Sequence, residues 1–166
     1  GIIVETGEAR EVMHFALLIG YGADAVNPYI AFATINELVM SGKIKNSGSY
    51  AESEGNYKKS LNKGLLKILS KMGTSTIRSY RGAQVFESVG LSEEFIEKYF
   101  TGTPTRISGI GADQVAAESV MKHKKAYIDR IKSLESDGVY SYRKGGEKHA
   151  WNPETIYMLQ WATRTD

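Results

Sequence analysis

The sequence predicts an α/β fold, in the form of an incomplete (β/α) barrel-like unit with parallel strands. Two observations predict this class. Short β-branched runs alternate with segments of helix length in which apolar residues recur every three or four positions. The connections between them are short and carry glycine, as is typical of parallel strands joined by right-handed crossovers. We therefore expect strands and helices to alternate along the chain.

The first part of the chain supplies two strand–helix pairs. Residues 2–5 form a β-branched run that predicts a short buried strand, and residues 8–19 carry the apolar face of an amphipathic helix. A second strand is predicted at 23–27 and a second helix at 30–40. The polar segment 45–56 is rich in serine, glycine and glutamate and predicts an exposed loop.

The next segment predicts a helix, a strand and a helix in turn. The first helix ends at Gly73, because glycine adopts the left-handed conformation after a helix without steric cost. A β-prone run at 75–80 predicts the third strand, and residues 84–89 predict a further helix. Parallel sheets meet ligands and partners at the loops after their strands, here 80–83. The apolar face of the first helix consists of Leu61, Leu65, Ile68, Leu69 and Met72.

The last part of the chain is predicted to be mainly helical. Ser92 is suited to cap a helix that runs to about residue 100, because acidic residues follow it in the first turn. Residues 101–111 hold glycines and a proline and predict an irregular loop. A long, largely polar helix is predicted at 113–133, followed by a glycine-rich polar segment at 137–149. Asn152, with proline next to it, opens the final helix.

Composition narrows the classes of function. The chain has 166 residues, a formal net charge of +2 and no cysteine. The absence of cysteine excludes a disulfide framework, a thiolate nucleophile and a thiolate-held zinc or iron–sulfur site within this sequence. Its apolar runs are shorter than the roughly 18 residues of a membrane span, so we expect no membrane partner and a cytoplasmic setting. The sequence begins GIIVET, in what reads as mid-strand, and we expect a fragment or a processed piece.

Polar side chains near the ends of the predicted strands are candidate interdomain or channel contacts. Arginine suits bidentate contacts to carboxylates or phosphates, but bracing a domain interface is the role that we favour here. The carboxylate after the first strand has no identifiable acid–base partner, so no catalytic residue is assigned. The candidates are Glu5 and Thr6 after the first strand, Tyr29 after the second, and Arg78, Tyr80 and Arg81 at the end of the third.

Further features leave alternatives open. His149 precedes a helix start, where it could meet a partner, although a ring packed on Trp151 is the simpler interpretation. His14 has an acidic residue one turn before it, and two such ligands alone cannot hold a metal. The glycine-rich segment 102–111 could cradle a phosphate through backbone N–H groups, but it matches no known phosphate-binding pattern and favours a structural turn. The lysines at 122–132 favour a solvated helix face, so we expect no nucleic-acid partner.

Strings that lie in order over nearly the whole chain carry a family resemblance. They are IVET at 3–6, HFALLIGYGA at 14–23, NPY at 27–29, NKGL at 62–65, SKMG at 70–73, SYRGAQ at 79–84, FTGT at 100–103, GGE at 145–147 and NPE at 152–154. Together they closely resemble the large subunit of glutamate synthase.

The resemblance implies a role within a larger enzyme. In that family an N-terminal amidotransferase releases ammonia from glutamine, using an N-terminal cysteine. An FMN-binding barrel with an iron–sulfur cluster then reduces the 2-iminoglutarate formed from 2-oxoglutarate and ammonia. A central α/β unit, which is TIM-barrel-like but incomplete, joins these domains and helps to wall the ammonia channel. This sequence resembles the later part of that central domain.

The resemblance also implies boundaries and partners. We expect residues 1–136 to be the latter part of the central domain and residues 137–166 to be a connector leading toward the FMN-binding synthase domain. The expected partners are the amidotransferase and FMN-binding domains of the same polypeptide and, for the parent enzyme, a small reductase subunit or ferredoxin.

The family's catalytic cysteine and cluster cysteines have no counterpart here, so we expect no cofactor in this fragment and no catalysis by it alone. The parent would be an oxidoreductase of glutamate biosynthesis that needs FMN and an iron–sulfur cluster. The alternative function is a stand-alone FMN- or phosphate-binding α/β barrel domain.

Overall fold

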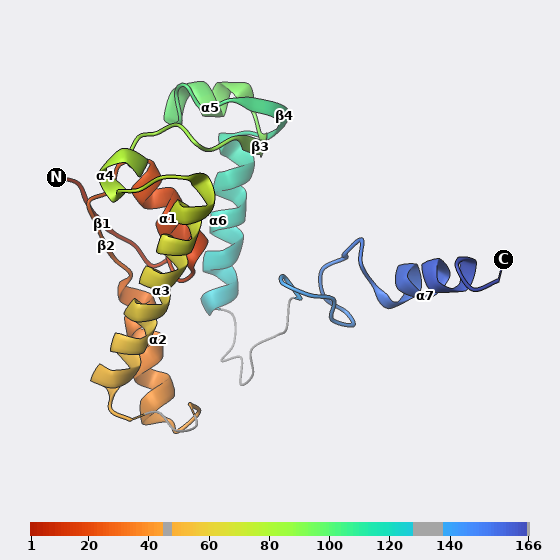
Figure 1. Ribbon diagram of the computed structural model, residues 1–166, viewed down its shortest axis with the longest axis horizontal. Helices are drawn as coiled ribbons and strands as arrows, with labels where there is room; N and C mark the ends of the chain where they lie inside the picture. Colours follow the sequence, from red (N-terminus) through yellow and green to blue (C-terminus); the bar gives the residue numbers. More distant parts are fainter. Residues whose placement is uncertain (45–47, 128–137, 166) are drawn as a thin grey trace. The chain divides into compact units, whose positions relative to one another are not determined.

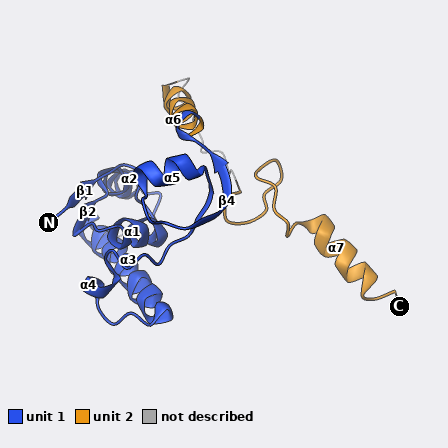
Figure 2. Ribbon diagram, turned by 90° about the horizontal axis from the view of Figure 1, so that it is seen from above, with its two compact units in different colours: residues 1–113 blue, residues 114–166 orange. Residues whose placement is uncertain are grey.

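The computed structural model describes residues 1–44, 48–127 and 138–165. The chain divides into two compact units, Gly1–Asp113 and Gln114–Asp166, which Figure 2 distinguishes by colour. Unit 1 holds short parallel strand pairs with helices, and its described residues form no closed barrel. The predicted incomplete α/β unit with parallel strands is therefore confirmed. The predicted boundary at 136 lies outside the described residues.

The first strand pair follows the sequence closely. Strand β1 (Ile3–Glu5) pairs in parallel with β2 (Ala25–Asn27), with Val4 opposite Val26. Helix α1 (Val12–Gly20) connects the two strands, and α2 (Tyr29–Met40) follows β2 (Figure 1). The expectation of a buried first strand is wrong, because Ile3 of β1 is 76% exposed. One face of the sheet packs against the core through Val26 of β2, and Ile3 lies on the other face.

Helix α3 (Tyr50–Met72) is longer than predicted. The Ser49 hydroxyl accepts a hydrogen bond from the backbone N–H of Glu52 at 3.3 Å, which caps the first turn. Residues 50–56, predicted as loop, are therefore helical, while 45–47 lie outside the described residues. The predicted end is confirmed, because Gly73 follows the helix with φ of 71°.

The predicted third strand is a short helix, α4 (Ile77–Tyr80). The Thr76 hydroxyl accepts from the backbone N–H of Ser79 at 3.2 Å, and this local cap outweighs the β propensity of the run. The helix predicted at 84–89 is also wrong. Residues 83–87 contain no helix or strand and lead into strand β3 (Ser88–Leu91), so the chain passes from α4 to the second strand pair without a further helix.

The second strand pair joins β3 in parallel to β4 (Thr105–Ile110), with irregular register. Helix α5 (Glu93–Tyr99) connects them, and Ser92 caps it as predicted by accepting from the Phe95 N–H at 3.2 Å. The irregular loop predicted at 101–111 is therefore wrong for most of its length. Its Gly109 lies against the neighbouring strand, where a Cβ would come within 2.3 Å of the Gly90 carbonyl oxygen.

The core of unit 1 lies between α1 and α3. Phe15 and Leu61 are its largest buried residues, and the ring of Tyr57 contacts Phe15 edge-on at 6.5 Å between centroids. The two helices approach closely at Gly64, where a Cβ would lie 2.5 Å from a methyl group of Val12. Of the predicted apolar face of α3, Leu61 and Leu69 are buried and Met72 is 41% exposed.

Aromatic rings join α1 to the second strand pair. Tyr21, directly after α1, stacks on Phe86 at 5.5 Å between centroids and meets Phe100 edge-on at 5.3 Å. Its hydroxyl is hydrogen-bonded to that of Thr103 at 2.9 Å. The two strand pairs are thus held together by side-chain packing, since no strand of one pairs with a strand of the other among the described residues.

Unit 2 contains most of helix α6 (Ala112–Tyr127) and helix α7 (Pro153–Ala162). The predicted continuation of α6 to 133 lies outside the described residues. Asn152 caps α7 and Pro153 occupies its first turn, as the sequence predicts. Among the helices that the structure describes, none has both the length and the apolar character that crossing a membrane requires.

Candidate interdomain site

The candidate contacts fall at opposite ends of the first strand pair, whereas the sequence places them at one edge. Glu5, Thr6 and Tyr29 lie at the carboxyl ends of β1 and β2. The backbone N–H of Thr6 donates to the Asn27 carbonyl at 3.1 Å, which continues the ladder beyond the strands. The side chain of Glu5 is exposed and that of Tyr29 is 48% exposed. Both can therefore be reached from outside this chain.

Arg81 lies at the amino ends of the strands, after helix α4, which replaces the predicted third strand. The guanidinium of Arg81 forms an ion pair with Asp24, the residue before β2, and donates to the Gly22 carbonyl at 3.0 Å. Asp24 also accepts from the backbone N–H of Ile2, directly before β1, at 2.6 Å. Arg81 and Asp24 therefore tie the segment after α4 to the start of both strands.

Tyr80 is buried inside unit 1. Its side chain is 1% exposed, and its hydroxyl donates to the Ala16 carbonyl in α1 at 2.9 Å. Burial raises the pKa of the Tyr80 phenol. The backbone N–H of Gly82 adds a hydrogen bond to the Gly20 carbonyl at 2.8 Å. The segment 80–82 is thus fastened to the end of α1, while Arg78, earlier in α4, is exposed.

Asp24 is the functional residue that the sequence interpretation missed. It stands in the predicted second strand, and nothing in the pattern GADAV distinguishes it from a solvated carboxylate. Only the fold brings it to Arg81, which lies far along the chain. The Nε atom of Arg81 is buried and has no hydrogen-bond partner among the described residues, so the guanidinium is held through its two terminal nitrogens. Because the Asp24 carboxylate is engaged by Arg81 and by the backbone N–H of Ile2, the pair is suited to fixing the backbone.

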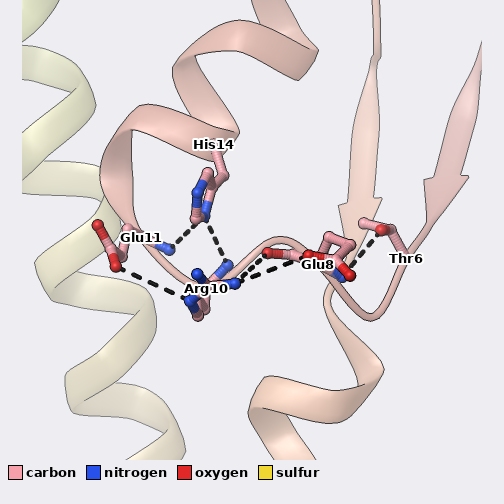
Figure 3. Close-up of polar contacts among 5 residues, drawn as sticks. All are labelled: Thr6, Glu8, Arg10, Glu11 and His14. Carbon is pink, nitrogen blue, oxygen red and sulfur yellow. Dashed lines mark hydrogen bonds and ion pairs between the residues drawn. The ribbon is translucent and has the colours of Figure 1, made fainter. Parts of the chain in front are cut away.

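A second polar cluster opens α1 (Figure 3). The Nδ1 atom of His14 accepts hydrogen bonds from the backbone N–H groups of Arg10 and Glu11, each at 3.2 Å. An acceptor at Nδ1 places the ring proton of the neutral imidazole on Nε2. The side chain of Arg10 pairs weakly with Glu8 and Glu11, at 3.8 and 3.9 Å. His14 therefore acts as a helix cap, and the described residues around it form no metal cluster.

His149 belongs to a separate cluster in unit 2. Its Nε2 atom is hydrogen-bonded to the Gly138 carbonyl, and its own carbonyl accepts from the Asn152 amide at 3.0 Å. A hollow of about 700 Å³ lies beside it, and Arg143 and Glu147 are among the residues that line it. These bonds hold the imidazole within the loop. His149 belongs to unit 2, whereas all the other candidate residues belong to unit 1.

Cofactor binding finds little support in the residues present. The chain has no cysteine to ligate an iron–sulfur cluster, and the described residues contain no group of His, Asp and Glu side chains suited to a metal. The glycine-rich segment 102–111, a possible phosphate cradle in the sequence, is largely strand β4. An apolar hollow of about 470 Å³ between α1 and β3–α5 offers no charged anchor apart from Glu87, which pairs with Arg106 at 3.3 Å.

Comparison with known proteins identifies the family. A family model described as the glutamate synthase central domain matches residues 1–92. The chain is 51% identical over 98% of its length to a glutamate synthase [NADPH] large chain of Bacillus subtilis, and 41% identical to a glutamate synthase [NADH] of Schizosaccharomyces pombe, also over 98%. A ferredoxin-dependent glutamate synthase of Antithamnion sp. is 39% identical over 99% of the chain. The chain spans 11%, 8% and 11% of these relatives, respectively. It therefore belongs to the glutamate synthase family, and residues 1–92 are those of the family's central domain.

Proposed function

We propose that this chain is part of a glutamate synthase polypeptide, in which it links the amidotransferase and FMN synthase domains and helps to wall the ammonia channel between them. The parent reaction converts glutamine, 2-oxoglutarate, two electrons and two protons into two molecules of glutamate. The observation that carries the proposal is the identity of 51% over 98% of the chain to a large chain of which this segment forms 11%.

The range of relatives supports a role that does not depend on the electron donor. Relatives named for NADPH, NADH and ferredoxin match the chain at 51%, 41% and 39% identity, in each case over nearly its whole length. The sequence of a segment that bound one particular electron donor would be expected to differ between relatives that use different donors. We therefore assign contact with a reductase subunit or ferredoxin to other parts of the parent, and likewise the binding of FMN and the iron–sulfur cluster. The cytoplasmic setting and the connector at 137–166 remain predictions.

The geometry divides the interdomain candidates into two groups. The side chains of Tyr80 and Arg81 form hydrogen bonds and an ion pair within unit 1, and these bonds hold α4 against α1 and the strands. Glu5, Tyr29 and Arg78 are exposed, and their side chains form no hydrogen bond or ion pair with the described residues. The exposed group is thus the better test of an interface, because its substitution leaves the internal bonds intact.

The experiment compares coupled and uncoupled activities in the full-length polypeptide. Arg78→Ala and Tyr29→Ala should lower glutamine-dependent glutamate synthesis several-fold while glutamine hydrolysis changes little, because the domains are then held less well in register. A tenfold loss corresponds to about 1.4 kcal/mol. Lys67→Ala, at an exposed position of α3, is the matched control. Unchanged ratios of synthesis to hydrolysis in both variants would contradict an interdomain role for these residues.

A further inference from the structure

Helix α7 presents apolar side chains on every side. Ile156, Tyr157, Met158 and Leu159 are consecutive, and consecutive helical residues point about 100° apart, so together they surround the axis. They are 40%, 66%, 57% and 55% exposed, respectively, and Trp161 is 60% exposed. No residue of the helix is buried. A helix that is apolar all round is normally enclosed by other structure.

The start of α7 is nevertheless fixed by polar bonds. The Asn152 side-chain oxygen accepts from the backbone N–H groups of Glu154 and Thr155, at 2.9 and 3.0 Å. The Thr155 hydroxyl donates to the Ala150 carbonyl at 2.7 Å, and the Asn152 amide donates to the His149 carbonyl. These bonds organise the turn before the helix without any apolar core. These bonds fix where the helix begins but not its later turns, so they lower only part of the entropy cost of docking.

The chemistry of α7 favours a protein cleft over a membrane surface. Interfacial helices carry a basic face opposite an apolar one, whereas α7 has an acid in its first turn and no basic residue in its last. Tyrosine and tryptophan, here Tyr157 and Trp161, are the residues most enriched where protein interfaces are fully buried. The partner must therefore be apolar and must contact the helix from more than one side.

The length of the relatives indicates where that partner is. The segment forms only 11% of the Bacillus subtilis large chain, so most of such a polypeptide is available to enclose the helix. We propose that α7 is a docking helix that inserts into an apolar cleft formed by the rest of the glutamate synthase polypeptide, with Tyr157 and Trp161 as its anchors. This proposal rests on the proposed function, because it takes the partner to be the remainder of that polypeptide.

Hydrogen–deuterium exchange in the full-length polypeptide tests the proposal directly. A ten-residue helix alone in water is marginal, so the amides of 153–162 should exchange quickly in the 166-residue chain. In the full-length polypeptide the same amides should exchange at least about 100-fold more slowly. Fast exchange in an active full-length polypeptide would overturn the proposal, as would slow exchange in the 166-residue chain alone at any concentration.

Variants separate docking from the intrinsic stability of the helix. Tyr157→Lys should raise the exchange of 153–162 in the full-length polypeptide but not in the 166-residue chain, because lysine is a good helix former and position 157 is exposed there. Arg164→Ser, at an exposed position just beyond the helix, is the control and should change neither. Protected amides in a full-length polypeptide without glutamate synthase activity would uphold the docking helix and overturn the proposed function.

Discussion

Arg81 and Asp24 form an ion pair that fastens the segment after α4 to the amino ends of both strands of the first sheet. The pair connects two parts of the chain, around residues 24 and 81, that are far apart in the sequence. Arg81 adds a bond to the Gly22 carbonyl, and Gly82 adds one to the Gly20 carbonyl. The loop that the sequence presents as a ligand or partner contact, with an interdomain role favoured, therefore forms bonds within unit 1.

Arg81→Ala should lower the free energy of unfolding by about 1–2 kcal/mol, because both the ion pair and the bond to Gly22 are lost. Urea unfolding followed by circular dichroism measures the change. The matched control is Arg10→Ala, whose ion pairs are longer than 3.7 Å and whose side chain is 62% exposed, with an expected cost below about 0.5 kcal/mol. Equal costs for the two variants would contradict the bracing role.

Gly64→Ala should destabilise the chain by about 1–3 kcal/mol, because the added methyl group collides with Val12 where α1 and α3 meet. Gly55→Ala is a control in the same helix. Apart from its chain neighbours and the backbone of its own helix, no described atom lies within 4 Å of a Cβ built at Gly55, so that variant should gain up to about 1 kcal/mol of helix propensity. Thermal unfolding of the two variants should shift in opposite directions, and a gain for Gly64→Ala would show that the helices do not meet there.

Alkaline pH should destabilise the chain through the phenols of Tyr80, which is buried, and Tyr57, which is half-buried. Burial raises the pKa of both Tyr57 and Tyr80 above 10.0, while in the unfolded chain these phenols titrate near the ordinary value. Their contribution is therefore fully present below pH 10 and is lost as the pH rises through the raised pKa values.

In Tyr80→Phe the free energy of unfolding should fall less steeply between about pH 9 and pH 11 than in the unsubstituted chain. At neutral pH the same variant should be less stable by about 1 kcal/mol, because the hydrogen bond to the Ala16 carbonyl is lost. Urea unfolding at several pH values measures both effects. Tyr99→Phe, at a ring that is 55% exposed, is the control. A pH profile of Tyr80→Phe identical to that of the unsubstituted chain would contradict the assignment.

His14→Leu should cost about 1 kcal/mol, because the backbone N–H groups of Arg10 and Glu11 lose their acceptor at the start of α1. His14→Asn supplies a shorter side-chain acceptor and should recover part of the loss. His123→Leu, on the exposed part of α6, serves as the comparison. If His14→Leu were no worse than His123→Leu, the cap would contribute nothing to stability.

Local signals in the sequence predicted several elements well. Gly73 ends α3, Ser92 caps α5, and Asn152 with Pro153 begins α7, as expected. Each of these depends on a few neighbouring residues and one backbone hydrogen bond or dihedral angle, which the sequence displays directly. The predictions failed at 75–89 and 101–111, where short β-prone or glycine-rich runs are equally compatible with strand, turn and loop.

By itself, the sequence determined the α/β class, the parallel first strand pair, the main helix ends and the family. Tertiary structure alone decided that Tyr80 is buried, that Arg81 meets Asp24, and that the candidate contacts divide between the two ends of the strands. The physical reason is the distance along the chain over which each kind of interaction acts. Periodicity and capping act over a single turn or strand, whereas the position of α4 depends on packing and hydrogen bonds to α1 and β2, which lie distant in the chain.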